Sequence, residues 1–289
     1  MVFRRTLFRR VAILGTGLIG GSIGLAMRKD KLADQVFGLS RQDESIKAAI
    51  KMGAIEDGAT DMKKVVYGAD LVILAGPVKV IAEQLKEVGG YLRRGTIVTD
   101  VGSTKAGIVE AAQKFLPAHI LFVGSHPMAG SEKSGVANAH ADLFKGAACI
   151  MTPNEKTNRL AKDKVKHLWE TLGMTVRMMD PIQHDEILAY VSHLPHITAF
   201  SLIRSIPDDF LQHASTGLRD TTRLAGSSSK MWSDISTSNC RNLLKGIDEM
   251  VGQLSELRKA IIDKDEAALA TYFNQAKAKR EMLDGQAHG

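Results

Sequence analysis

The stretch that decides the fold reads Arg10-Val-Ala-Ile-Leu-Gly-Thr-Gly-Leu-Ile-Gly20. Its apolar residues before Gly15 predict a buried strand, and residues 19–28 predict the helix that follows. Gly15 permits a tight turn, Gly17 lets a pyrophosphate approach the backbone, and Gly20 lets helix and strand pack closely. Free N–H groups at the helix N-terminus favour phosphate. We therefore predict a dinucleotide site at Gly15, Gly17, Leu18, Ile19 and Gly20; the alternative is a plain strand-to-helix turn with incidental glycines.

The alternation of strand and helix continues from this motif to about residue 180. Apolar runs predict further strands at 35–39, 71–75, 97–101, 120–123, 147–151 and 176–179. Helical patterns intervene at 45–51, 80–88, 105–115 and 160–172. Continuous Val/Ile/Leu runs between helices are typical of a parallel sheet covered on both faces. The predicted fold is a doubly wound, Rossmann-type α/β domain.

After Asp180-Pro181 the pattern is helical throughout. Residues 182–206 predict one long helix with a kink at Pro195, and residues 247–261 carry an apolar stripe at helical spacing. We expect a dinucleotide-binding domain over 1–180 and an all-α substrate-binding and dimerisation domain over 181–289. The predicted assembly is a homodimer through the helical domain; the alternative is that its apolar stripes are ordinary core.

Composition excludes several classes of protein. Hydrophobic residues make up 44% of the 289 residues, which is too many for a disordered chain. The longest apolar runs, such as 69–77, are far shorter than the roughly 20 residues that a bilayer requires. Lys and Arg number 38 against 32 acids, but they are scattered, so we expect a small acidic substrate or phosphate-bearing cofactor rather than nucleic acid. Two isolated cysteines, Cys149 and Cys240, indicate a reduced compartment, and we expect a cytoplasmic protein rather than one with an Arg-rich transit peptide.

The end of the second strand bears on the choice of cofactor. An NAD site usually has an acid there, whereas this chain reads Phe37-Gly-Leu-Ser40-Arg41. Ser40 can donate a hydrogen bond, and Arg41 can pair with a 2′-phosphate. We predict that NADP is favoured over NAD; the alternative is that Arg41 is an ordinary surface arginine.

Three short stretches stand where strands end, at the edge where such sheets bind ligands. They are Ala75-Gly-Pro-Val78, which adds Gly76 and Pro77 to the cofactor site, Asp100-Val-Gly-Ser103, and Gly124-Ser-His-Pro-Met-Ala-Gly130. Pro127 predicts an extended conformation at His126, and the flanking glycines predict that it lies on a loop. Its near-neutral pKa suits it to take a proton from an alcohol as hydride leaves. Ser103 converges on the same place; the alternative is a solvated loop histidine.

Two motifs of the helical half carry polar groups. In Ser192-His-Leu-Pro-His196, two histidines share a helix face, but without a third ligand we expect no metal. In Leu218-Arg-Asp-Thr-Thr-Arg223, Arg223 can bind a substrate carboxylate through two hydrogen bonds. The alternative for that stretch is a helix cap with a surface salt bridge.

Taken together, these residues resemble the prephenate/arogenate (cyclohexadienyl) dehydrogenase family of tyrosine biosynthesis, from about Arg10 to about Leu283. The motifs that carry the resemblance are Asp100-Val-Gly-Ser-Thr-Lys105, Gly124-Ser-His-Pro-Met-Ala-Gly-Ser-Glu-Lys-Ser-Gly135, Ser192-His-Leu-Pro-His196 and Arg219-Asp-Thr-Thr-Arg223. The resemblance implies an N-terminal nucleotide-binding domain, a helical dimerisation domain and an active site between them.

The resemblance also implies roles for single residues. His126 would hydrogen-bond the ring hydroxyl of the substrate, and Ser103 would orient that group near the nicotinamide. Arg223 would pair with a substrate carboxylate. Further implied pocket residues are Ser192, His193 and His196, a gating Glu132 with Asp220, and, by less specific matches, Trp232 and His184.

The implied reaction is an oxidative decarboxylation. Hydride leaves C4 of the cyclohexadiene while His126 takes the hydroxyl proton, and loss of the C1 carboxylate as carbon dioxide makes the ring aromatic. The residues do not distinguish prephenate from arogenate. One alternative is a two-domain NAD(P)-dependent dehydrogenase of the 3-hydroxyacid type, which usually relies on a lysine in the helical half. The other is a non-catalytic NAD(P)-binding protein.

Overall fold

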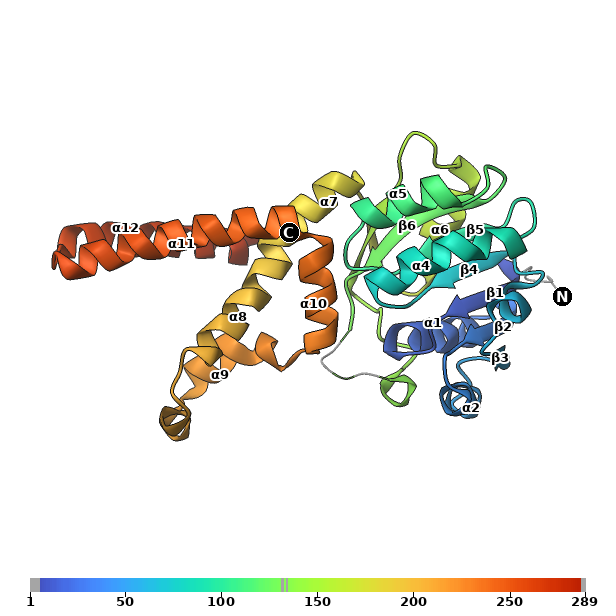
Figure 1. Ribbon diagram of the computed structural model, residues 1–289, viewed down its shortest axis with the longest axis horizontal. Coiled ribbons are helices and arrows are strands. Elements are labelled where there is room, and N and C mark those ends of the chain that lie inside the picture. Colours follow the sequence, from blue (N-terminus) through green and yellow to red (C-terminus); the bar gives the residue numbers. More distant parts are fainter. Residues whose placement is uncertain (1–5, 131–132, 134, 287–289) are drawn as a thin grey trace. The chain divides into compact units, whose positions relative to one another are not determined.

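The first part of the chain is built around one eight-stranded sheet (Figure 1). The computed structural model describes residues 6–130, 133 and 135–286. The strands are β1 (Phe8–Leu14), β2 (Ala33–Leu39), β3 (Asp57–Ala59), β4 (Leu71–Leu74), β5 (Ile97–Asp100), β6 (Leu121–Pro127), β7 (Ala148–Thr152) and β8 (Thr175–Met178). Their spatial order is β3-β2-β1-β4-β5-β6-β7-β8. The order reverses between β1 and β4, which is the switch point of a doubly wound sheet.

Helices cover both faces of this sheet. They are α1 (Leu18–Lys29), α2 (Asp43–Lys51), α3 (Met62–Val66), α4 (Val78–Val88), α5 (Ala106–Phe115) and α6 (Arg159–Thr171). Val11 and Ile13 of β1 pack in the core under α1, α2 and α6, whereas Ala12 and Leu14 pack in the core under α3, α4 and α5. The predicted Rossmann-type fold is confirmed. The sequence pattern did not predict β3 and α3, because both elements are short and β3 contains no apolar run.

One pair of strands departs from the predicted parallel sheet. β7 runs antiparallel to β6, with His126 opposite Ile150. β6 also extends to Pro127, beyond the predicted end at residue 123. The predicted loop position of His126 is therefore wrong. Pairing with β7 holds this segment extended, and a residue before proline favours the same conformation.

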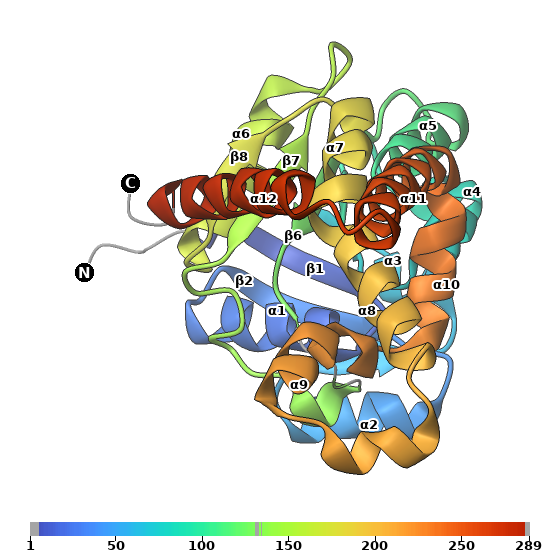
Figure 2. The same ribbon diagram turned by 90° about the vertical axis from the view of Figure 1, so that its left-hand side faces the viewer.

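Beyond β8 the described chain is helical. Its helices are α7 (Pro181–Leu188), α8 (Leu194–Arg204), α9 (Thr216–Thr222), α10 (Ser229–Ser238), α11 (Cys240–Ile262) and α12 (Glu266–Gln286). Figure 2 shows α7 running on into α8. The predicted helix over 182–206 is observed as these two helices, joined by a π-helical turn at Ala189–His193. Pro195 follows that turn, and it has no N–H for the carbonyl one turn earlier, so the regular α-helical ladder is interrupted before it.

By its internal contacts the chain divides into two compact units, residues 1–240 and 241–289. The first unit includes the sheet together with α7 to α10, so the units divide the chain later than the predicted boundary near residue 180. That boundary stays a prediction. Within the described residues, no helix is long and apolar enough to cross a membrane.

Candidate active site

The turn between β1 and α1 has the geometry that a dinucleotide requires. Gly15 has a φ of +121°, and a Cβ there would come within 2.7 Å of the carbonyl oxygen of Ala75. A Cβ on Gly20 would overlap the carbonyl oxygen of Gly15. Beside Gly17 the space is open, and no side chain in the described part of the chain caps the first turn of α1. The N–H groups of that turn can therefore bind phosphate oxygens.

The other predicted cofactor residues lie at the same edge of the sheet. Ser40 and Arg41 directly follow β2; Ser40 is half-buried and Arg41 is exposed. Gly76 and Pro77 directly follow β4 and lead into α4. Because parallel strands share one carboxyl edge, the fold brings these residues to the side of the β1–β4 switch point where the glycine turn lies.

His126 lies near the carboxyl end of β6 and is partly exposed. Its Nδ1 is 2.9 Å from Nε2 of His184, and the two rings meet edge-on with centroids 5.1 Å apart. Among the described residues, Nε2 of His126 has no hydrogen-bond partner. One ring nitrogen is therefore held by the protein, and the other is unpaired within the described part of the chain.

A carboxylate holds the far side of His184. Nδ1 of this buried histidine lies 2.8 Å from Oδ1 of Asp185. The same carboxylate accepts the main-chain N–H groups of Lys105 at 2.7 Å and Ala106 at 2.9 Å. Asp185 of α7 therefore caps the N-terminus of α5. A continuous hydrogen-bonded row runs from His126 to that helix.

A buried ion pair stands next to this row. The side chains of Lys105 and Asp100 are inaccessible to solvent and pair directly. Nζ of Lys105 also donates to the carbonyl oxygen of Ser125 at 2.9 Å. The Asp100 carboxylate accepts the N–H of Gly102 at 2.8 Å and that of Ser125 at 3.1 Å. These bonds tie the β5–α5 loop, which carries the half-buried Ser103, to β6.

The electrostatics of the site favour neutral histidines. Burial, the neighbouring His184 and the Lys105 cation together lower the pKa of His126 well below 6.5. Burial also lowers the pKa of His193 to about 4, although Asp185 opposes the shift. This shift favours the neutral form of His126, in which one ring nitrogen has a lone pair that can accept a proton.

The two histidines of the 192–196 motif share one aromatic contact. His196 stacks on Trp232 of α10 with ring centroids 3.8 Å apart, and His193 meets the same indole edge-on at 5.9 Å. Nδ1 of His196 donates to the carbonyl oxygen of Ser192 at 2.9 Å. The buried indole N–H of Trp232 has no hydrogen-bond partner among the described residues.

Arg223 lies directly after α9, and its side chain is exposed. Burial lowers the pKa of His196, and the charge of Arg223 lowers it further, so the guanidinium acts on the His196–Trp232 pair. Asp220 is exposed one turn earlier. Within the described part of the chain these two residues form no salt bridge with each other, unlike the alternative considered for this stretch. The predicted gating residue Glu132 lies outside the described residues.

The sequence did not predict three residues that connect the histidines, the buried ion pair and the 192–196 motif. They are Lys105, Asp185 and Asn239. The side-chain amide of Asn239 donates to the carbonyl oxygen of Asp185 at 2.6 Å and lies 3.2 Å from Nδ1 of His193. Most of their contacts join residues 46 to 80 positions apart and leave no local pattern. The available signals were that Asp185 directly follows His184 and that Lys105 stands five positions after Asp100.

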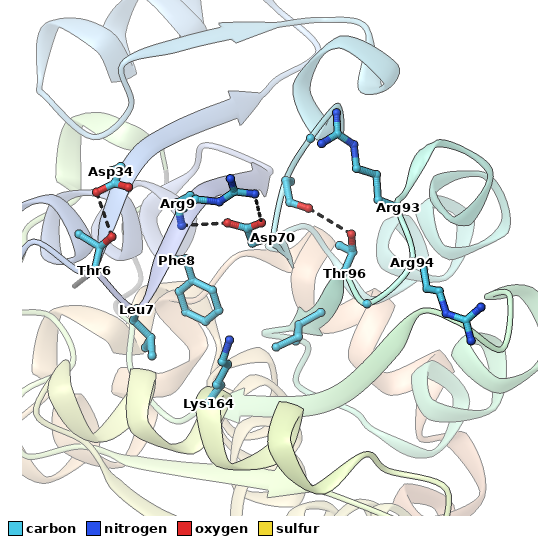
Figure 3. A pocket seen from close by; sticks show the side chains of 14 residues that line it. Thr6, Leu7, Phe8, Arg9, Asp34, Asp70, Arg93, Arg94, Thr96 and Lys164 are labelled. Carbon is cyan, nitrogen blue, oxygen red and sulfur yellow. Dashed lines mark hydrogen bonds and ion pairs between the residues drawn. The ribbon is translucent and has the colours of Figure 1, made fainter.

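A separate cleft lies at the opposite edge of the sheet, where β1, β4 and β5 begin (Figure 3). Arg9 pairs there with Asp70 at 3.5 Å, while Arg93, Arg94 and Lys164 line other parts of the wall. This cleft is remote from the carboxyl edge and contains none of the predicted site residues. We therefore place the site at His126 rather than in the cleft.

Fold and site define the class of protein. A doubly wound nucleotide cradle and a neutral histidine at the same sheet edge are the parts of a dehydrogenase that uses a nicotinamide cofactor. Two family models agree, described as the nucleotide-binding domain of prephenate dehydrogenase over residues 23–178 and its dimerization domain over residues 180–275. The chain belongs to the prephenate dehydrogenase family.

Individual relatives support this assignment. A prephenate dehydrogenase of Bacillus subtilis is 38% identical over 94% of this chain and 76% of its own length. The crystal structure of prephenate dehydrogenase from Aquifex aeolicus, in complex with hydroxyphenyl propionate and NAD+, has a TM-score of 0.88 at 34% identity, covering 95% of this chain and 98% of that one. An arogenate dehydrogenase of Synechocystis has a TM-score of 0.80 at 28% identity over 95% and 99%.

The 3-hydroxyacid alternative shares only the fold. A 3-hydroxyisobutyrate dehydrogenase of Mycobacterium tuberculosis is 15% identical to this chain, with a TM-score of 0.51 over 80% of this chain and 70% of that one. Family membership therefore supports the prephenate dehydrogenase interpretation over this alternative.

Proposed function

We propose that this dehydrogenase oxidatively decarboxylates prephenate, arogenate or both in tyrosine biosynthesis. One observation carries the proposal: at the edge of the sheet where the nucleotide cradle lies, Nδ1 of His126 is held by His184, while Nε2 has no hydrogen-bond partner among the described residues. The family supplies the substrate class, because its named members act on prephenate or arogenate.

In this proposal the chain supplies a base and a binding pocket. Nε2 of His126 accepts the proton of the C4 hydroxyl, and Ser103 orients that hydroxyl. A dinucleotide whose pyrophosphate is held by the turn of Gly15, Gly17 and Gly20 would supply, through its nicotinamide, the acceptor for the hydride of C4. The C1 carboxylate then leaves as carbon dioxide, and its bonding electrons complete the aromatic ring. Proposed pocket residues are Ser192, His193, His196, Trp232 and Arg223, with Glu132 and Asp220 at the entrance.

A turnover assay tests this function. Purified protein is offered prephenate, arogenate and, for comparison, a 3-hydroxyacid, each with NAD and with NADP, and reduced cofactor and carbon dioxide are measured. We expect both products in equal amounts with at least one pair. Turnover of a 3-hydroxyacid instead would favour the first alternative, and cofactor binding without turnover of any of these substrates would favour the non-catalytic one.

Arg223→Ala is expected to raise the substrate KM about 10- to 150-fold while the cofactor KM stays unchanged. A charged hydrogen-bond pair to a carboxylate contributes about 1.5–3 kcal/mol, which gives this range. Steady-state kinetics against both ligands measure the effect, with Arg204→Ala at the exposed end of α8 as the control. If both KM values rise together, Arg223 is structural.

We further propose that NADP is preferred to NAD. The half-buried Ser40 and exposed Arg41 support this, because they follow β2 where an NAD site would have a carboxylate. We expect a higher kcat/KM with NADP, and reversal of the order by Ser40→Asp with Arg41→Ala, since the new carboxylate repels phosphate and accepts ribose hydroxyls. Preference for NAD in the unaltered protein, or indifference to the double substitution, contradicts the proposal.

We also propose a cytoplasmic homodimer formed through the helical domain. Large apolar side chains of α11 and α12 are more than half exposed, among them Leu244, Val251, Leu254, Ile261 and Phe273. Surfaces of this kind favour association. Both cysteines are free thiols, which fits a reducing compartment. The mass of the protein in solution tests the dimer.

A further inference from the structure

We propose that His184 and Asp185 are positioning residues that fix the tautomer of His126, so that Nε2 is its basic nitrogen. The inference rests on the proposed function, because it names the atom that takes the substrate proton. His184 would act on the reaction only through its hydrogen bond to His126.

For a His184 that carries a single ring proton, Asp185 sets the direction of the row. A carboxylate only accepts hydrogen bonds, so Nδ1 of His184, 2.8 Å from Oδ1, must be the donor. The remaining Nε2 of a neutral His184 then has a lone pair. It accepts a hydrogen bond from Nδ1 of His126 at 2.9 Å. In a neutral His126, the proton therefore lies on Nδ1 and the lone pair lies on Nε2.

The orientation of the Asp185 carboxylate is fixed by its hydrogen bonds. Its two oxygens accept the main-chain N–H groups of Lys105 and Ala106, at 2.7 and 2.9 Å. The carbonyl oxygen of the same residue accepts the amide of Asn239 at 2.6 Å. Asp185 is almost fully buried, so water does not compete for these positions. The helical segment thus orients the histidine of β6 through two fixed residues.

The charged and titratable groups around His126 keep it neutral. His184 faces it from α7, His193 from the π-helical turn, Lys105 from the β5–α5 loop and Cys149 from β7. Burial lowers the pKa of His126, and positive charge on His184, the Lys105 cation and positive charge on His193 each lower it further. Burial raises the pKa of the Cys149 thiol, so that group adds no charge at neutral pH.

The tautomer can be measured without turnover. In the full-length protein labelled with ring-15N histidine, long-range 1H–15N correlation spectra distinguish a protonated Nδ1 from a protonated Nε2. The His126 signals are assigned by their loss in His126→Asn. We expect His126 to be protonated on Nδ1. A neutral ring protonated on Nε2, or a doubly protonated ring at pH 7, would overturn the proposal.

Two substitutions of His184 separate positioning from packing. His184→Leu fills similar space but offers no acceptor, so His126 is free to take the other tautomer. We expect kcat to fall about 10²-fold while the substrate KM changes less than about threefold. His184→Gln places an amide oxygen near the former Nε2, and we expect it to restore at least about tenfold of that loss. His167→Gln on the exposed surface of α6 is the control, with kcat expected to stay unchanged.

The outcomes distinguish this inference from the proposed function. A chain that never turns over prephenate or arogenate would contradict the proposed function, but its His126 tautomer would still be read from the spectra. A chain that turns them over, yet shows equal kcat for His184→Leu and His184→Gln, would overturn the positioning role. Thermal denaturation of both variants shows whether either loss comes from unfolding.

Discussion

His126→Asn is expected to lower kcat by about 10²–10⁴-fold, the range for loss of a positioned base. Asparagine can still donate from near the position of Nδ1, so the contact with Nε2 of His184, 2.9 Å away in the native protein, has a replacement. What the variant lacks is Nε2, the nitrogen proposed to accept the substrate proton. Because the glycine turn after β1 lies on other elements, cofactor affinity should stay the same.

Steady-state turnover with the preferred substrate measures this effect, and cofactor titration by fluorescence checks the binding site. The matched control is His119→Asn, at an exposed histidine before β6. The control should retain the kcat of the unaltered protein. Turnover of His126→Asn within a few-fold of that value would remove His126 from the mechanism.

Lys105→Met should lower the free energy of unfolding by about 3–5 kcal/mol, because it leaves the buried Asp100 carboxylate without its cation. Methionine fits the space of the lysine stem but cannot pair with the carboxylate or donate to the carbonyl oxygen of Ser125. Urea unfolding at fixed protein concentration measures the difference. The loss is expected even in the absence of cofactor and substrate.

Two comparisons make this result specific to the buried charge. Asp100→Asn combined with Lys105→Met should be less destabilised than Lys105→Met alone, since no unpaired charge remains buried. Lys64→Met at an exposed site of α3 should change stability by less than about 0.5 kcal/mol. If Lys105→Met and Lys64→Met behave alike, the ion pair contributes nothing to stability.

The sequence determined the fold class and the edge of the sheet where the site lies. Apolar runs such as 10–14 and 71–74 are continuous because both faces of their strands are buried, and that pattern is local. The glycines at 15, 17 and 20 report backbone approach, which is also a local requirement. Histidines beside proline and glycine at strand ends could likewise be found by position and residue type alone.

Tertiary structure decided which side chains of the site contact one another. Antiparallel pairing with β7 extends β6 through His126, although the residues around it read as a loop. The bonds from His126 to His184, from Asp185 to the N-terminus of α5, and from Asn239 to Asp185 join segments far apart in sequence. Periodicity and spacing describe one element at a time, so they carry no information about which side chains meet when elements pack. The tautomer of His126 and the buried partner of Lys105 follow from that packing.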